Sequence, residues 1–582
     1  MRLKVTNSKN SKSFYIIKDY TKNKKRSTKV VHTIGNLKQV KELAGSENYE
    51  PWLKNYVENY KQKHKEKKEE VIIKKNSGKL ITKNKQVSFD IGHVFLKEIY
   101  QGLKLNEICN KVSSRYKFEF NLDDILSNLI YGRIIHPASK LKTHKISKNF
   151  IQAPNIKLPN MYRGLTYLNK EMDYIQETLY ENSLSLIERD SRVIYFDCTN
   201  FYFEITAEDD LRKYGINKQH QPKPQVGMGL FMDGNGIPLA INIYPGNASE
   251  TKQLIPTQTK IIDNFKLPDT RLVTCTDAAM CTDEIKKFNI KDGRGFVITQ
   301  SLKKLKQSYL DEVFIDKDWR IPGDLKNTYN INGIQNNEVL TKKYYETIFY
   351  KIIPTETASV KQDLIVTFSL KYRDYRKSIR DDQIKRANKK ITNNSNGDKI
   401  KLNTNPNDYR RFIQEKAISK DNKTIDAYEY SVDYKKIEDE EKYDGYYGIT
   451  TNLNDDIKTI LSITRGRWEI EESFRIMKHD FKTGTVELTR EDRITAHFLT
   501  CFISLLIYRI LEKKLNYKYT TTQILDTLRT MKVTECKGDG YIPAYERTDI
   551  TDDLHDFLGF RTDYEILTYK YIEKLFDIIS KK

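Results

Sequence analysis

Residues 464–481 read T-R-G-R-W-E-I-E-E-S-F-R-I-M-K-H-D-F, and this is the best-marked helical stretch of the chain. Ile470, Phe474, Met477 and Phe481 recur at the spacing of one face of an α-helix. We therefore expect one helix over this stretch, docked by an apolar stripe onto a core.

A line of charged residues runs beside this stripe. Arg467, Glu471 and Lys478 are four and then seven positions apart, so they project from neighbouring turns of the same side. A merely solvated helix would carry its charges opposite the stripe, whereas these lie at its rim. An amphipathic helix with i,i+4 ion pairs is the plainer alternative for the same pattern.

The composition favours a nucleic-acid partner over a membrane. The chain has 582 residues, with 100 Lys and Arg against 79 Asp and Glu, and a net charge of +21. This length suggests about three or four domains. Part of the basic excess is of the kind that AT-rich genomes produce, because Lys, Asn, Ile and Tyr are all abundant.

Cysteine usage and hydropathy indicate a soluble protein of a reducing compartment. The six cysteines form no C-x-x-C pair, so zinc-finger spacing is absent. The N-terminus lacks an apolar signal core. The most apolar run, residues 496–511, is shorter than the roughly 20 residues of a membrane span and contains His497 and Arg509, so we expect a buried helix.

The N-terminal third is predicted to bind DNA. Residues 14–20 and 28–34 are typical of two strands joined by the basic turn 21–27, which either follows a phosphate backbone or is simply solvated. Residues 52–68 predict a charged helix, followed by a basic linker. Further on, residues 89–112 and 122–135 are apolar-periodic helices. A cluster of Lys and His follows them: Lys140, Lys142, His144, Lys145 and Lys148.

From residue 193 the pattern changes to mixed α/β. Residues 227–233 and 237–244 predict a hairpin across Gly234-Asn235-Gly236. Two other apolar strands end in an aspartate, at Asp197 and Asp277. A buried carboxylate is costly unless it is paired or bound to metal, so both positions need a chemical reason.

Five regions follow from these patterns. They are 1–85, a basic hairpin, helix and linker; 86–190, a helical DNA-binding region; 191–300, the first part of an α/β core; 301–455, a mostly β insertion with a cationic helix at 373–390; and 456–582, the last core helix and a helical tail.

Three acidic residues can converge on one edge of the core sheet. Asp197 and Asp277 end strands, and Glu471 lies on the helix described first. Three carboxylates without cations would repel one another, and two divalent metal ions resolve that repulsion and suit phosphoryl transfer. Arg467 and Lys478 are placed to hold a phosphate.

These residues resemble the DDE-class transposases of bacterial insertion sequences, in the branch with a Y-(2)-R-(3)-E-(6)-K motif (the IS-four superfamily, sixteen-thirty-four-like). Arg467, Glu471 and Lys478 match that spacing. Further blocks resemble the family as well: F-D-C-T-N-F-Y-F-E at 196–204, G-L to G-I-P at 229–238, P-G-N-A-S at 245–249, D-A-A-M at 277–280 and R-I-I-H-P-A-S-K at 133–140.

The resemblance implies an α/β fold: an RNase-H-like catalytic core interrupted by a β-rich insertion, with an N-terminal β-hairpin and helical DNA-binding region. It implies cleavage of DNA at the ends of the element and joining of 3′ hydroxyls to target DNA, with Mg²⁺ as cofactor and Mn²⁺ as a substitute. The implied partners are double-stranded DNA, as terminal inverted repeats and target, and further copies of the chain, as a homodimer or higher in the synaptic complex. No membrane partner is expected, and the implied location is the bacterial cytoplasm at the nucleoid.

The resemblance also assigns roles. Asp197, Asp277 and Glu471 would be metal ligands, and Arg467 and Lys478 phosphate clamps. Trp468 would stack on a base or, as we expect, lie in the core. Thr464 stands where the motif has Tyr, and its hydroxyl would also contact the DNA or a phosphate. Ala279 stands where a Gly is usual.

Two alternatives stay open at this point. One is a structure-specific nuclease or resolvase on the same fold, and the other is a catalytically inactive DNA-binding relic.

Overall fold

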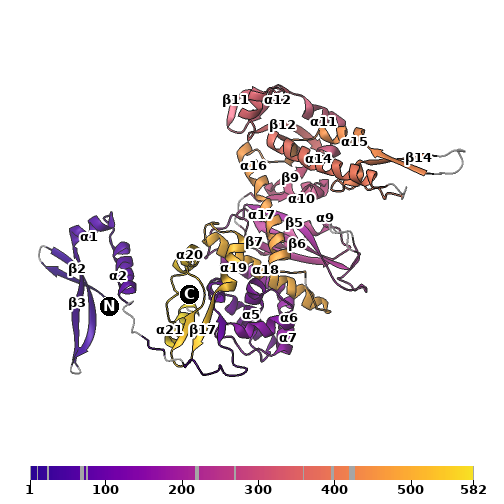
Figure 1. Cartoon of the computed structure of the whole chain (residues 1–582). Coiled ribbons are helices and arrows are strands. Elements are labelled where there is room, and N and C mark those ends of the chain that lie inside the picture. Colours follow the sequence, from indigo (N-terminus) through magenta and orange to yellow (C-terminus); the bar gives the residue numbers. More distant parts are fainter. Residues whose placement is uncertain are drawn as a thin grey trace. The chain divides into compact units, whose positions relative to one another are not determined.

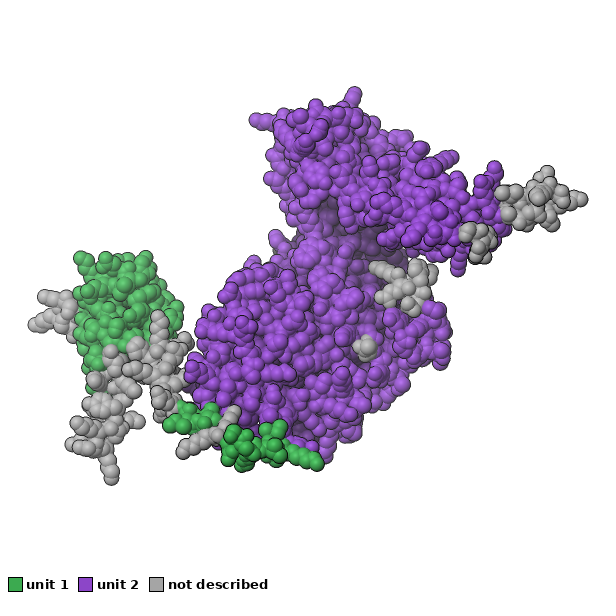
Figure 2. All heavy atoms as spheres, in the orientation of Figure 1, with its two compact units in different colours: residues 1–83 green, residues 84–582 purple. Residues whose placement is uncertain are grey.

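The computed structural model describes residues 2–8, 11–22, 25–65, 71–73, 76–215, 222–265, 267, 271–357, 360–394, 399–418, 427–484 and 486–580. The chain divides into two compact units, residues 1–83 and 84–582, which Figure 2 colours separately.

The first unit is a small sheet with two helices. Its three antiparallel strands are β1 (Arg2–Ser8), β2 (Ser11–Lys22) and β3 (Lys25–Asn36), and its helices are α1 (Leu37–Ala44) and α2 (Glu50–Lys65). The predicted hairpin is present as β2 and β3, but strand β1, which pairs with β2, was not predicted. The tip of the basic turn, residues 23 and 24, lies outside the described residues.

Seven short elements open the second unit. They are β4 (Ser88–Asp90), α3 (His93–Gly102), α4 (Leu105–Tyr116), α5 (Leu122–Ile135), α6 (Lys140–Ile146), α7 (Leu158–Lys170) and α8 (Met172–Ser183). The bounds predicted for α5 are confirmed. The single helix predicted over 89–112 is wrong, because the chain forms β4 first and then turns between α3 and α4 at Lys104, whose φ is +53°.

These helices share one apolar core with α18 (Glu491–Lys514). By length and composition α18 is apolar enough to cross a membrane, yet 94% of its most apolar stretch is buried in the protein. The predicted buried helix at 496–511 is therefore confirmed.

A ten-stranded sheet runs through the second unit in the order β11-β10-β12-β13-β16-β9-β8-β5-β6-β7 (Figure 1). Five of these strands belong to the predicted core: β5 (Val193–Tyr202), β6 (Gln225–Asp233), β7 (Pro238–Pro245), β8 (Val273–Thr276) and β9 (Gly295–Gln300). β5, β6 and β7 form an antiparallel meander, which confirms the predicted hairpin, while β8 and β9 run parallel to β5. Gly236 allows the hairpin turn, with φ at +72°.

Different helices cover the two faces of these strands. One face, with Ile194 and Phe196, packs in a core with α9 (Thr251–Asn264) and α10 (Asp283–Ile290). The other face, with Tyr195 and Cys275, faces the core that contains α18. Alternate residues of β5 therefore point into different cores.

The insertion continues the same sheet. Its sheet strands are β10 (Trp319–Ile321), β11 (Asp324–Tyr329), β12 (Ile348–Thr357), β13 (Val360–Ser369) and β16 (Tyr446–Thr451), and a separate hairpin is formed by β14 (Ile413–Ile418) and β15 (Ala427–Val432). Helices accompany them: α11 (Gln307–Phe314), α12 (Ile331–Gln335), α13 (Glu338–Lys343), α14 (Leu370–Thr392) and α15 (Tyr434–Glu441). The segment is thus mixed α/β, not mostly β.

The stretch at 464–481 is not one helix. It comprises the end of α16 (Ile457–Gly466), then α17 (Trp468–Arg475), then a π-helical turn, Ile476–Asp480. After α18 come α19 (Thr521–Thr530), β17 (Lys532–Cys536), β18 (Gly540–Pro543), α20 (Asp549–Leu558) and α21 (Tyr569–Ser580). The tail predicted as helical therefore also contains a hairpin, which pairs with β4.

Candidate active site

Two of the predicted acids lie level with each other on neighbouring parallel strands. Asp277 directly follows β8, whereas Asp197 lies in the middle of β5, which continues to Tyr202, so the prediction that this strand ends at Asp197 is wrong. The parallel register aligns three residues that share one face of the sheet: Tyr195 of β5, Cys275 of β8 and Val297 of β9. Two residues further on, the same register and the same face bring Asp197, Asp277 and Thr299 into one row. Asp197 and Asp277 are both partly exposed there.

Asp277 is fixed by the turn that follows its strand. Its Oδ1 accepts hydrogen bonds from the backbone N–H groups of Ala279, at 2.9 Å, and Met280, at 3.3 Å, in the 3₁₀ turn Ala278–Met280. Ala279 is not among the residues with positive φ, so the turn has no need of the glycine usual in the family at this position.

The helix α17 covers the face on which this row lies. Ile470 and Phe474 are buried in the same core as Tyr195 and Cys275. Met477 and Phe481 are buried in it too, so the predicted apolar stripe is confirmed even though the helix changes form along its length.

Arg467 links the helix to the strand ends. It lies at the junction of α16 and α17, where one guanidinium nitrogen donates to Thr299 Oγ1 at 3.1 Å and another to Glu471 Oε1 at 2.8 Å. Burial acts to lower the pKa of Arg467, but the hydrogen bond to Glu471 and nearby acidic groups, Asp197 among them, outweigh it and raise that pKa. Arg467 therefore feels the negative charge both of the sheet and of the helix.

Glu471, the third predicted metal ligand, is not held close to the two aspartates. Its side chain is 61% exposed and is held by Arg467, which is the i,i+4 pair that the plainer alternative predicted. Among the described residues, the ligand oxygens of Asp197, Asp277 and Glu471 do not all lie within 4.8 Å of one another. The structure thus aligns the two aspartates and places Glu471 on the helix that covers their face.

Lys478 lies on the π-helical turn. This turn is closed by the bond from Phe481 N–H to Ile476 O, 2.9 Å long and spanning five residues. π-turns of this kind are frequent at functional sites. The Lys478 ammonium lies 5.5 Å from the centre of the Phe201 ring, on the same strand as Asp197. His479 beside it is exposed.

Two predictions about neighbouring residues need correction. Trp468 is 56% exposed, so the expectation that it lies in the core is wrong, and its ring is accessible to a ligand. Thr464 donates its hydroxyl to Ile460 O at 3.0 Å, so that hydrogen is used within its own helix and is not presented to a phosphate.

A buried arginine anchors α17, and the sequence analysis did not identify its role. Arg509 of α18 donates to Glu469 of α17, to Glu512 Oε2 at 2.6 Å and to Gly236 O at 3.2 Å. It joins α17, α18 and the β6–β7 turn behind Glu471. The sequence does carry a sign of this role, because Arg509 is a charged residue inside the most apolar run of the chain.

Two basic residues of the 133–140 motif hold the segment after the π-turn. Arg133 is buried and donates to Phe481 O at 2.9 Å. Lys140 is also buried, 3.0 Å from Nδ1 of His497, whose Nε2 lies 3.0 Å from Thr483 O. Burial, helped by the nearby Arg133 charge, lowers the pKa of Lys140 to about 7. Lys140 is therefore no part of an exposed DNA-binding cluster, which corrects the prediction.

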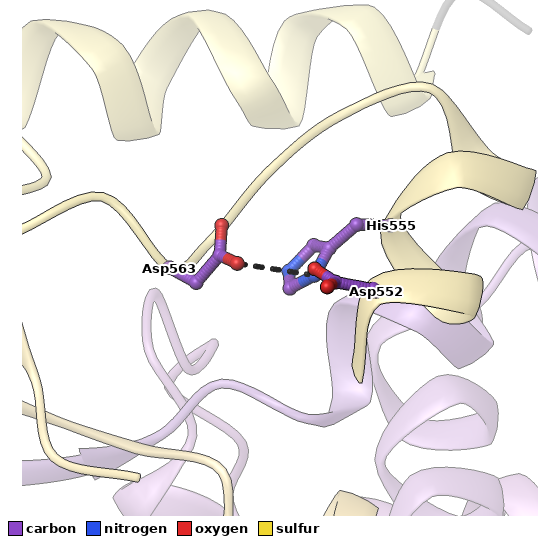
Figure 3. Close-up of side chains that lie close together, drawn as sticks. All are labelled: Asp552, His555 and Asp563. Carbon is purple, nitrogen blue, oxygen red and sulfur yellow. Dashed lines mark ion pairs between the residues drawn. The ribbon is translucent and has the colours of Figure 1, made fainter. Parts of the chain in front are cut away.

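A cluster of Asp552, His555 and Asp563 lies apart from this row, in the C-terminal helical region (Figure 3). Arg561 pairs with both aspartates, and His555 Nε2 accepts the backbone N–H of Thr562 at 3.0 Å. Because an arginine already balances the two carboxylates, we interpret this cluster as a structural ion-pair network.

Comparison with known proteins gives a family. A solved structure described as a "piggyBac transposase synaptic complex with hairpin DNA" is similar at 9% identity and a TM-score of 0.36, over 84% of this chain and 85% of that one, too distant to support an argument. Among curated proteins, none matches. The family described as "Transposase DDE domain" matches residues 188–507, which include the aspartate row, Arg467, Glu471 and Lys478. That match spans more than half of the sequence, and the chain therefore belongs to the family of DDE-domain transposases.

Proposed function

We propose that this chain is the transposase of a bacterial insertion sequence. It binds the terminal inverted repeats, cleaves DNA at the ends of the element and joins the 3′ hydroxyls to target DNA, acting as a homodimer or larger assembly at the nucleoid of the bacterial cytoplasm. The observation that carries this proposal is the row of Asp197, Asp277 and Thr299 beneath α17, with Arg467 reaching from the helix to Thr299 and Glu471.

The topology supports an RNase-H-like core. The strand order is β7-β6-β5-β8-β9, with β8 and β9 parallel to β5, and the two aspartates lie on adjacent parallel strands, Asp197 within β5 and Asp277 directly after β8. The insertion enters after β9 and returns before α16 and α17, the helices that carry Arg467 and Glu471. The spacing of Arg467, Glu471 and Lys478 supports the Y-(2)-R-(3)-E-(6)-K branch.

The acidic residues suit divalent metal ions. Their donors are carboxylate oxygens, which Mg²⁺ prefers and Mn²⁺ also accepts, and Asp277 is already oriented by two backbone N–H groups. Asp197, Asp277 and Glu471 would hold these ions, whose chemistry is to activate the attacking oxygen and to stabilise the leaving oxygen.

The other residues would hold the DNA. Arg467 can exchange its bond to Glu471 for a phosphate oxygen, since a guanidinium binds either partner with two parallel hydrogen bonds. Lys478, near the Asp197 strand, supplies a second cation. The exposed Trp468 ring can stack on a base.

Substitution of the three acids tests the proposal. Asp197→Asn, Asp277→Asn and Glu471→Gln should each abolish cleavage of a labelled inverted-repeat end while binding stays within a few-fold of wild type, and chelation should stop wild-type cleavage. Glu472→Gln is the matched control, because Glu472 lies on the same helix but pairs with Arg475. Near-normal cutting by any of the three variants removes that residue from the site.

A further inference from the structure

The helix α14 of the insertion carries most of its net positive charge at its C-terminal end. It has 23 residues, L-K-Y-R-D-Y-R-K-S-I-R-D-D-Q-I-K-R-A-N-K-K-I-T. All three of its carboxylates lie at or before Asp382. The segment after Asp382 contains Lys385, Arg386, Lys389 and Lys390 and no acidic residue. We call these four residues the α14 basic patch.

A small core fixes which side of the helix faces solvent. Ala387 is fully buried and packs with Ile400, Phe412 and Ile413, and Ile384 and Ile391 lie against the same cluster. This apolar side holds α14 against the segment that leads into the hairpin β14–β15, which Figure 1 shows beside it. All four members of the α14 basic patch are exposed on the remaining surface.

The two halves of α14 differ in ion pairing. In the first half, three of the five cations form ion pairs: Lys371 with Glu346 at 2.8 Å, Arg373 with Asp374 at 2.8 Å and Arg380 with Asp444 at 2.5 Å. In the patch, Lys385 lies 3.5 Å from Asp382, with both side chains largely exposed, and such a pair is worth little. The part of the chain that the structure describes shows no ion pair for Arg386, Lys389 or Lys390.

We propose that the α14 basic patch binds the sugar–phosphate backbone of double-stranded DNA, without regard to sequence. Lys385 and Lys389, like Arg386 and Lys390, are four residues apart, so each pair is spaced by about 6 Å along one side of the helix and forms a cationic ridge. Unpaired, exposed cations on a rigid helix are the usual means of neutralising phosphates. This inference rests on the proposed function, since it assumes that the substrate is duplex DNA.

Helix stability offers another explanation for part of the pattern. Lys389 and Lys390 lie in the last turn of α14, where cations interact favourably with the helix dipole. That explanation predicts a change in melting temperature without a change in DNA binding, so the two can be separated.

The test compares two variants of the full-length protein that lose the same charge. In the first, Lys385, Arg386, Lys389 and Lys390 are all changed to Gln, which preserves helix propensity. In the second, the same change is made at four exposed lysines elsewhere in the insertion: Lys317, Lys342, Lys343 and Lys435. Binding to a short duplex of arbitrary sequence is measured across a salt series in chelator, which prevents cleavage.

We expect the patch variant to bind at least tenfold more weakly at low salt. The slope of log K against log salt should become shallower by about 3.6, or about 0.9 for each phosphate that the variant no longer neutralises, while the slope of the control should change by less than about 0.9. Equal slopes for the two variants would overturn the proposal. If wild type itself shows no salt-dependent binding to DNA, the proposed function fails instead.

Lysine acetylation of wild type gives an answer that does not depend on a variant folding. Bound duplex should protect Lys385, Lys389 and Lys390 from the reagent and leave Lys342 and Lys343 reactive. Equal labelling of both sets with and without DNA contradicts the proposal.

Discussion

At the scale of single residues, Arg467 decides how the candidate site is held together. It binds Thr299 on the sheet and Glu471 on the helix at the same time, and the charge of Asp197 reaches it as well. A guanidinium in this position offsets the repulsion between the acids and can later bind a phosphate in place of Glu471.

The two proposed clamps should affect cutting more than binding. Arg467→Ala and Lys478→Ala should each slow single-turnover cleavage by about 10- to 100-fold, because a charge-assisted contact is worth about 1.5–3 kcal/mol, while affinity for the end changes less. Arg467→Lys retains the charge but loses the two-armed geometry and should fall in between. Wild-type cutting by both Ala variants would leave Arg467 and Glu471 as a simple i,i+4 ion pair.

Lys140 should make stability depend on pH. Burial lowers its folded pKa from 10.5 to about 7, so between these values the unfolded chain binds a proton that the folded chain does not. The free energy of unfolding therefore rises by up to about 1.4 kcal/mol per pH unit as the pH rises above 7. Below pH 7 the folded protein bears the full cost of burying the charged ammonium. The gain in melting temperature from pH 7 to pH 9 should shrink in Lys140→Met and persist in Lys142→Met, whose side chain is exposed. The same gain in both variants would count against a neutral Lys140.

At the scale of elements, α17 is held in place by contacts on the sides that do not carry Glu471. Its apolar stripe packs into the core, and Glu469 binds Arg509 of the buried helix α18. Glu471 and Glu469 are two residues apart, so one side of the helix faces the strand ends while the other is anchored.

Arg509→Met should therefore destabilise α17 and impair cleavage, although Arg509 is not itself a site residue. Removing one partner of a buried ion network leaves Glu469 and Glu512 uncompensated, which costs about 3–5 kcal/mol. We expect a clear drop in melting temperature and loss of cleavage on warming well below the melting point. Arg475→Met, on the exposed side of α17, should cost within about 1 kcal/mol. Equal melting of the two variants would show that Arg509 does not anchor the helix.

The sequence predicted those features of the fold that depend on neighbouring residues in the chain. The β6–β7 hairpin follows from Gly234-Asn235-Gly236, the bounds of α5 from its apolar run and the His136-Pro137 turn after it, and the buried face of α17 from its stripe. What the sequence did not reveal depends on tertiary contacts. Lys140 and Arg133 are buried against groups more than 300 residues away, and Trp468 is exposed although other residues of its helix pack into the core. The row formed with Thr299 required the sheet register, which no single strand specifies.

At the scale of the whole molecule, the two compact units have separate cores. Phe14, Ile16 and Val40 pack within residues 1–83, whereas the helices of residues 86–190 share the core of α18. A fragment that ended near residue 190 would therefore expose the core face of those helices. The boundary that respects both cores lies near residue 83.

Removal of the first unit should separate binding from folding. A chain of residues 84–582 should keep the melting temperature of the second unit within a few degrees, because no residue of its core is removed. Its affinity for the inverted-repeat ends should fall, and the salt slope should become shallower because fewer phosphates are neutralised. Undiminished affinity and slope would assign end binding entirely to the second unit.

The pairing of β16 with β9 on one side and β13 on the other gives the insertion an evolutionary constraint. An insertion attached only by two flexible linkers could be lost by a single deletion without exposing a strand edge. This insertion instead covers the edge of β9, and a descendant that lost it would present unpaired N–H and C=O groups to every other copy in the cell. Any segment that replaced the insertion would therefore have to bring a strand of its own to pair with β9.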